Sequence, residues 1–124
     1  MKLSELKTID IEALEYRDTI NGNSYFSSNV ILNHGLNNSI QLKIPFQYGY
    51  ELQYLSTSLE EVSKHFPRSQ WYKKYMNKDM IEKKYKITIN HKITRGCKKK
   101  ELFHSRDIQK VKLSDKKIVE LVIQ

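Results

Sequence analysis

Alternating apolar and polar residues near the start of the chain predict β-strands. Within residues 8–16 every second position is apolar as far as Ala13, and a change of phase at Leu14 and Tyr16 indicates a β-bulge. An Asn-Gly pair, which is typical of a tight hairpin turn, separates this segment from a second strand-like run at residues 24–33. The two runs therefore predict a β-hairpin.

A third strand and an amphipathic helix are predicted next. Apolar residues recur at every second position from Ile40 to Phe46, and Pro45 places this strand at or near a sheet edge because proline cannot donate a backbone hydrogen bond. A helix that Pro67 helps to end is indicated by apolar residues spaced three, four, three and four apart: Leu52, Leu55, Leu59, Val62 and Phe66. We therefore expect an α+β fold in which the helix covers an antiparallel sheet.

The pattern beyond Pro67 is less regular. Ser69 is expected to cap a short helix that carries the aromatic residues after it, and residues 84–94 predict a strand with one apolar and one cationic face. A helical turn is expected over residues 98–104 and a final hairpin over residues 108–123. The sequence thus predicts a basic C-terminal segment built of a strand and a hairpin.

Charge divides the chain into two unlike parts. Residues 1–67 hold five Lys and Arg against eight Asp and Glu, a net −3, whereas residues 68–124 hold seventeen against six, a net +11. Such asymmetry indicates an anionic partner. We expect one domain, residues 1–124, in which a sheet-and-helix scaffold (1–67) carries a basic, ligand-facing part (68–124).

Three features predict a cytoplasmic protein. The longest apolar runs are only a few residues, so no segment is expected to span a bilayer. Residues 1–7 lack the apolar core of a secretory signal. Cys97 is the only cysteine, which excludes an intramolecular disulfide and fits a reducing compartment.

Motifs for catalysis are missing from the sequence. The four glycines are too scattered for a phosphate loop or a dinucleotide fingerprint, and no serine or cysteine stands in a nucleophile motif. His91, Cys97 and His104 match no common zinc spacing. We therefore expect a protein that is not an enzyme and that holds neither a metal nor a cofactor.

Aromatic and basic residues are interleaved after Pro67. Trp71, Tyr72 and Tyr75 surround two lysines, and such rings can stack on bases while the cations meet phosphates. An equally open alternative is a surface helix whose aromatic residues pack on the core. The aromatic run at residues 46–50 leaves a similar choice between core packing and a surface pocket or oligomer contact.

A second basic cluster follows the predicted cationic strand and is the candidate phosphate site. Its members are Arg95, Lys98, Lys99, Lys100 and Arg106. Arginine can hold a phosphate with two parallel hydrogen bonds, whereas lysine acts as a point charge, so Arg95 and Arg106 are the better candidates for specific contacts. The alternative is a solvated run of charges that only keeps the protein soluble.

Two phrases of the sequence resemble a group of small proteins encoded by tailed phages: NGNSYFS at residues 21–27 and PFQYGYE at residues 45–51. The chain as a whole is similar to the Thoeris anti-defence proteins, which act as sponges for a cyclised ADP-ribose signal, some of them also binding small cyclic oligonucleotides. The resemblance implies a non-enzymatic homo-oligomer with ligand pockets between protomers. It also implies that arginines late in the chain hold phosphates and that an aromatic ring stacks on the adenine.

Two other functions remain open from the sequence. The basic part also suits a nucleic acid or a nucleoprotein, as in an anti-CRISPR protein or a phage regulator, and it suits an acidic protein partner of a structural phage protein. Self-association is expected in addition, because one helix covers a three-stranded sheet and the eight tyrosines exceed what one small core needs.

Overall fold

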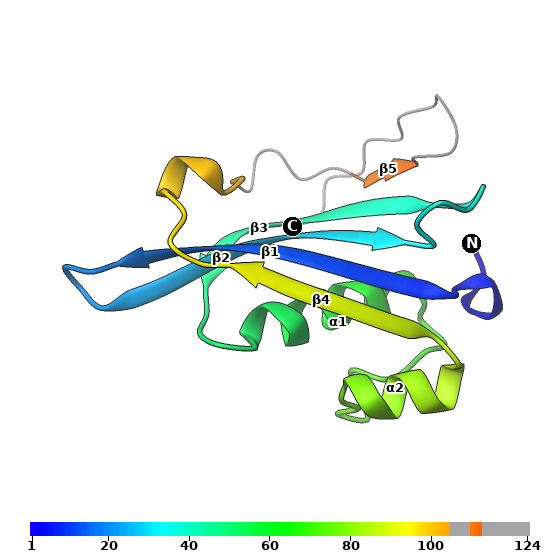
Figure 1. The fold of residues 1–124 in the computed structure, drawn as a ribbon. Helices are drawn as coiled ribbons and strands as arrows, with labels where there is room; N and C mark the ends of the chain where they lie inside the picture. The colour runs from blue at the N-terminus through cyan, green and yellow to red at the C-terminus, as the bar shows by residue number, and fades with distance from the viewer. Residues whose placement is uncertain (105–109, 113–124) are drawn as a thin grey trace.

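The computed structural model, which describes residues 1–104 and 110–112, shows an α+β fold (Figure 1). Three antiparallel strands open it: β1 (Thr8–Asp18), β2 (Asn23–Leu32) and β3 (Ile40–Tyr48). The meander predicted from alternation is therefore confirmed.

The predicted bulge in the first strand is wrong. β1 keeps a single register with β2 from Ile9 to Asp18, and the irregularity lies instead between β2 and β3, at residues 26–28. Leu14 and Tyr16 break the apolar alternation because they lie on the opposite face of the sheet, where Tyr16 stacks against Tyr25. Apolar residues on both faces of one strand give the same sequence pattern as a bulge that shifts the alternation by one residue.

Two helices connect the meander to a fourth strand. α1 (Gln53–His65) and α2 (Lys78–Tyr85) lie on one side of the sheet, below it in Figure 1, and precede β4 (Thr88–Thr94). The strand order is β4-β1-β2-β3-β5, with β5 spanning Lys110–Lys112. β4 pairs parallel to β1, so the sheet is mixed rather than wholly antiparallel. A parallel neighbour requires a long crossover, which the helical segment supplies.

The predicted aromatic helix after Ser69 is absent, and residues 71–75 form turns. Ser69 is buried, with its hydroxyl 3.0 Å from that of Ser63, so it caps no helix. The helix of this region is α2, which starts later because the Asn77 side chain accepts a hydrogen bond from the Met80 N–H at 2.9 Å.

The remaining boundaries differ less from expectation. The stripe predicted for α1 is buried except at Leu52, which precedes the helix and is exposed. Lys86 adopts a left-handed conformation, with φ of 55°, that ends α2, so the following strand starts at Thr88 and not at residue 84. A short 3-10 helix, η2 (Lys99–Glu101), forms within the predicted helical turn. Of the predicted final hairpin only β5 belongs to the described residues.

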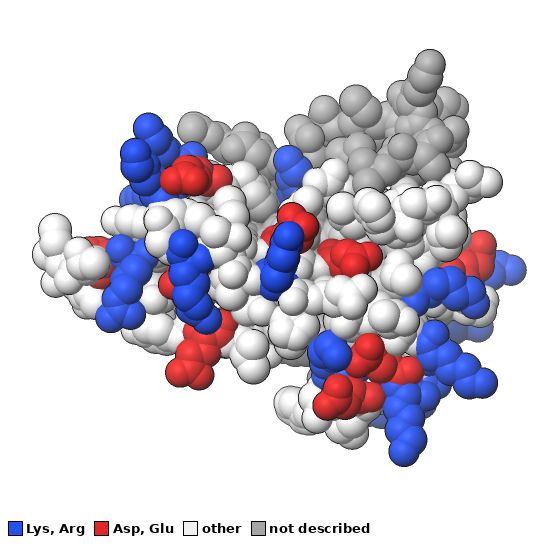
Figure 2. Space-filling view, viewed as in Figure 1, with Lys and Arg blue, Asp and Glu red and all other residues white. Residues whose placement is uncertain are grey.

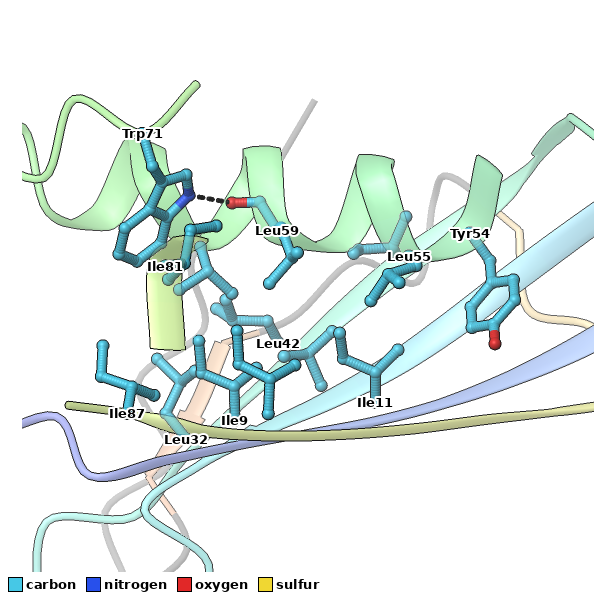
Figure 3. Packing of buried hydrophobic residues seen from close by; sticks show 14 of the residues in the cluster. Ile9, Ile11, Leu32, Leu42, Tyr54, Leu55, Leu59, Trp71, Ile81 and Ile87 are labelled. Carbon is cyan, nitrogen blue, oxygen red and sulfur yellow. Dashed lines mark hydrogen bonds between the residues drawn. The ribbon is translucent and has the colours of Figure 1, made fainter. Parts of the chain in front are cut away.

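The main core lies between α1 and the sheet, on what we call the helix face. Figure 3 shows side chains of α1, such as Leu55 and Leu59, pointing toward Ile9, Ile11 and Leu42 of the strands. Trp71 closes one end of this core and donates its indole N–H to the Leu59 carbonyl at 2.7 Å. Burial of the large indole ring stabilises the core, so Trp71 belongs to the scaffold.

Asn33, which is fully buried just after β2, joins the chain start to the sheet. Its Oδ1 accepts hydrogen bonds from the backbone N–H groups of Lys7, at 2.6 Å, and Thr8, at 3.2 Å. Its Nδ2 donates to the Glu5 carbonyl at 2.8 Å and to Asn38 at 3.0 Å. The residue also has a positive φ of 53°, which asparagine tolerates better than most residues.

Replacing Asn33 with alanine should lower the free energy of unfolding by about 2 kcal/mol, because buried backbone donors lose their acceptor. Urea denaturation followed by circular dichroism measures this loss. Asn38→Ala is the matched control: it removes one acceptor of the Asn33 Nδ2 while the Glu5 carbonyl remains, so it should cost less than Asn33→Ala. An Asn33→Ala variant as stable as the wild type would contradict the role assigned to the Asn33 side chain.

Candidate functional site: a basic turn beside a row of rings

The predicted phosphate residues are divided between the two faces of the sheet. Arg95 follows β4 and extends along the helix face, where its Nη1 lies 2.6 Å from Oε2 of Glu15. The Glu15 side chain is only 10% exposed and that of Arg95 is 57% exposed. Arg95 therefore neutralises a nearly buried carboxylate, a structural role that sequence reasoning did not foresee.

Lys98, Lys99 and Lys100 lie at η2, and we call them the basic turn. The chain leaves β4 at Gly96, whose φ of 75° suits glycine, and the Cys97 N–H then donates to the Glu15 carbonyl at 2.9 Å. After the turn, the Phe46 N–H donates to the Phe103 carbonyl at 2.8 Å. These contacts bring the basic turn toward the face of the sheet opposite the helices.

A row of aromatic rings lies beside the basic turn on that face. The Phe46 ring stacks on Tyr25 with centroids 4.9 Å apart, and Tyr25 stacks on Tyr16 at 6.3 Å. Tyr48 meets Tyr25 edge to face at 5.8 Å. We call Tyr16, Tyr25, Phe46 and Tyr48 the ring row; three adjacent strands contribute to it.

Cations and rings meet at one point of this surface. The Lys99 ammonium lies 5.7 Å from the centre of the Phe46 ring, within the range of a cation–π contact. The His104 ring also packs against Phe46, with the two ring centroids 5.0 Å apart. The site thus offers flat apolar surfaces next to positive charge.

The sequence predicts the cations of this site but not its rings. The aromatic run at residues 46–50 leaves core packing and a surface pocket or oligomer contact both open, and alternation assigns no ligand contact to Tyr16 or Tyr25. The available signal was that Tyr16 and Tyr25 stand at similar distances on either side of the hairpin turn, where antiparallel pairing places them directly opposite one another.

The predicted stacking residues lie elsewhere. Trp71 is 1% exposed and fills the core, so the prediction that it stacks on a ligand is wrong. Tyr72 and Tyr75 are 53% and 90% exposed and line a groove of about 680 Å³ between α1 and the turns before α2. The groove also reaches His91 of β4 on the helix face, whereas the basic turn contacts a ring on the opposite face of the sheet.

The groove has little positive charge of its own. Its charged lining residues are Glu60, Lys78 and Asp79, and Lys78 lies 2.7 Å from Glu82 of the next helical turn. Phosphate is therefore better placed at the basic turn than in this groove. The structure does not bring the predicted rings and the predicted cations together within one chain, and Arg106 lies outside the described residues.

The three side chains considered for zinc make separate contacts. The His91 Nδ1 lies 2.7 Å from the Tyr54 hydroxyl on the helix face, Cys97 approaches the Thr94 carbonyl at 3.5 Å, and His104 packs on the ring row. Among residues 1–104 and 110–112, no group of three metal-ligating side chains comes together.

Surface charge is mixed rather than uniform. Figure 2 shows Lys and Arg gathered over η2 at one end and around α2 at the other, with Asp and Glu interspersed among them. The described part of the chain includes no helix long and apolar enough to cross a membrane.

Comparisons with protein-family models, curated proteins and solved structures find no match for this chain.

Proposed function

We propose that this protein binds a nucleotide ligand without converting it, with the basic turn holding phosphate and the ring row stacking on the base. One observation carries the proposal: the Lys99 ammonium lies 5.7 Å from the Phe46 ring, which itself stacks on Tyr25 at 4.9 Å. Rings stack on any base, and each stacked base contributes about 1–3 kcal/mol.

Binding without turnover fits the state of the nearby acidic groups. Glu15 is held by Arg95, and Asp18 accepts hydrogen bonds from the side chain and the backbone of Asn21. The side-chain bond from Asn21 is the main reason that the pKa of Asp18 is lowered. A carboxylate with a lowered pKa is a weak general base, so we assign Asp18 to the scaffold, and the ion pair with Arg95 assigns Glu15 to it.

Sequestration of a cyclic ADP-ribose type of immune signal in the cytoplasm of a phage-infected cell is the ligand assignment we prefer. It follows from the resemblance to Thoeris anti-defence proteins, in which pockets form between protomers. In this proposal the ring row and the basic turn of each chain hold one ligand.

Single-stranded nucleic acid is the second candidate ligand. The observation that favours it is the arrangement of the rings, which come from three neighbouring strands of one sheet face rather than from the walls of the 680 Å³ groove. Sheet-borne rings next to lysines are a common platform for successive unstacked bases.

Mass spectrometry of small molecules released by heat distinguishes these ligands. Protein purified from cells that express a Thoeris signal synthase should release the cyclic nucleotide intact. In parallel, a fluorescent oligothymidylate is titrated against the same protein at several salt concentrations. Release of a hydrolysed product contradicts binding without turnover, and oligothymidylate binding without any captured signal favours the second candidate. The absence of both contradicts the proposed site.

A further inference from the structure

β4 forms one edge of the sheet (Figure 1), so the backbone groups on its outer side have no neighbouring strand in this sheet. The Thr88 N–H donates to the Lys7 carbonyl at 2.9 Å, toward β1. Successive N–H groups of a strand point to alternate sides, so the N–H groups of Ile89, His91 and Ile93 point away from the sheet.

The first of these outward groups is satisfied within the chain. The Ile89 N–H donates to Oε2 of Glu82 in α2 at 3.0 Å. The Lys78 side chain, and after it this N–H, lowers the pKa of Glu82, so the carboxylate stays ionised at neutral pH. For His91 and Ile93, no backbone hydrogen bond beyond the pairing with β1 is found among the described residues. The outer edge of β4 is therefore hydrogen-bonded within the chain at Ile89, and the N–H groups of His91 and Ile93 are available to a partner.

We infer that a second copy of this chain pairs with this edge, β4 against β4 in antiparallel orientation, about a two-fold axis at His91. An isologous contact of this kind uses the same surface on both copies, which the symmetry of the edge allows. The two sheets would then form one continuous sheet through the axis.

The register follows from which N–H groups are available. With His91 opposite its own copy, each His91 N–H donates to the other His91 carbonyl, and each Ile93 N–H donates to the Ile89 carbonyl of the second copy. In such a pair the Ile89 N–H faces the Ile93 carbonyl of the second copy, so on pairing it exchanges the Glu82 carboxylate for that carbonyl, while Glu82 keeps its ion pair with Lys78 at 2.7 Å. Every outward donor of β4 then has an acceptor.

Side chains also favour this register. Asn90 stands opposite Lys92 of the second copy, and Lys92 keeps its ion pair with Glu12 at 3.2 Å. Ile93, half-buried at the edge of the core, comes to lie opposite Ile89 of the second copy and is covered by it. Pairing centred on Lys92 would instead place two ammonium groups directly opposite each other, which is unfavourable.

The interface is distinct from the proposed nucleotide site. It uses the β4 edge, and His91 also lines the 680 Å³ groove, so the two grooves would open near each other across the axis. The ring row lies on the other face of the sheet, away from this contact. Failure of the interface would leave the assignment of the basic turn and the ring row unchanged, because its tests read mass and cross-linking without any nucleotide.

Disulfide trapping tests the register directly. In a Cys97→Ser background, Asn90→Cys and Lys92→Cys chains are prepared separately, mixed and oxidised. The proposed pairing brings these positions together as a non-hydrogen-bonded pair with Cα atoms about 4.5 Å apart, within the range of a disulfide. A covalent heterodimer should form in the mixture and not in either variant alone. A Lys92→Cys chain that cross-links with itself overturns this register.

Sedimentation tests the interface as a whole. The wild type should sediment at twice its chain mass of 14.8 kDa. Ile93→Pro removes an outward N–H that makes no ladder bond within one chain, so this variant should fold and sediment as a monomer. Ile93→Val keeps the N–H and should remain a dimer, and circular dichroism of both variants checks the fold. A monomeric wild type, or a dimeric and folded Ile93→Pro variant, overturns the proposal.

Discussion

Replacing Trp71 with alanine should lower the free energy of unfolding by about 3–5 kcal/mol, the usual cost of removing a buried tryptophan. The indole is 1% exposed, contacts Tyr85 edge to face at 5.5 Å and bonds the Leu59 carbonyl. Total stabilities of small domains are about 5–15 kcal/mol, so this single change removes a large fraction. Chemical denaturation monitored by far-ultraviolet circular dichroism measures it.

The neighbouring residue provides the matched control. Tyr72 is also aromatic but 53% exposed, so Tyr72→Ala should change stability by no more than about 0.5 kcal/mol, as for most surface positions. Trp71→Phe keeps a ring and removes the N–H, and should fall between the two. Equal stabilities of the Trp71→Ala and Tyr72→Ala variants would show that the tryptophan does not stabilise the core.

Replacing Lys98, Lys99 and Lys100 together with alanine should weaken oligothymidylate binding by at least about tenfold at low salt, because three charges beside the ring row are lost. Each neutralised phosphate of a single strand contributes about 0.7 to the slope of log affinity against log salt, so the slope should fall by about 2. Fluorescence anisotropy at four salt concentrations measures both quantities. Capture of the cyclic signal should be lost in the same variant.

A variant with equal charge loss at the far end separates position from total charge. Lys73, Lys74 and Lys83 are exposed, and their replacement by alanine also removes three positive charges. This control should keep most of the affinity, since its lysines lie near the groove and α2 rather than near the ring row. Equal losses in the two triple variants would show that binding depends on net charge alone.

The periodicity of the chain determined much of the scaffold. Alternation located the three meander strands, and the spacing from Leu55 to Phe66 located α1, because one buried face imposes its period on the sequence. Local signals failed after Pro67, where Ser69 and Trp71 suggest a capped aromatic helix. Their side chains are used in the core instead, and burial of an indole outweighs a weak capping preference.

The candidate site was less predictable from the sequence than the scaffold, because it depends more on tertiary contacts. The run of charge after β4 was visible in the sequence, and so was the identity of its lysines. Two contacts were not visible in the sequence: the ion pair of Arg95 with Glu15 on the helix face, and the contact of Lys99 with the Phe46 ring on the other face. Both contacts join residues distant in the chain, which composition and spacing do not encode.

Local periodicity and charge count were enough to predict the α+β class, the meander and the basic character of the part that follows it. Neither predicts that β4 returns parallel to β1 at the sheet edge, or that Tyr16, Tyr25 and Phe46 form one surface. Strand order and cross-strand register arise from burying the whole apolar surface at once, a condition on all segments together and not on any one of them.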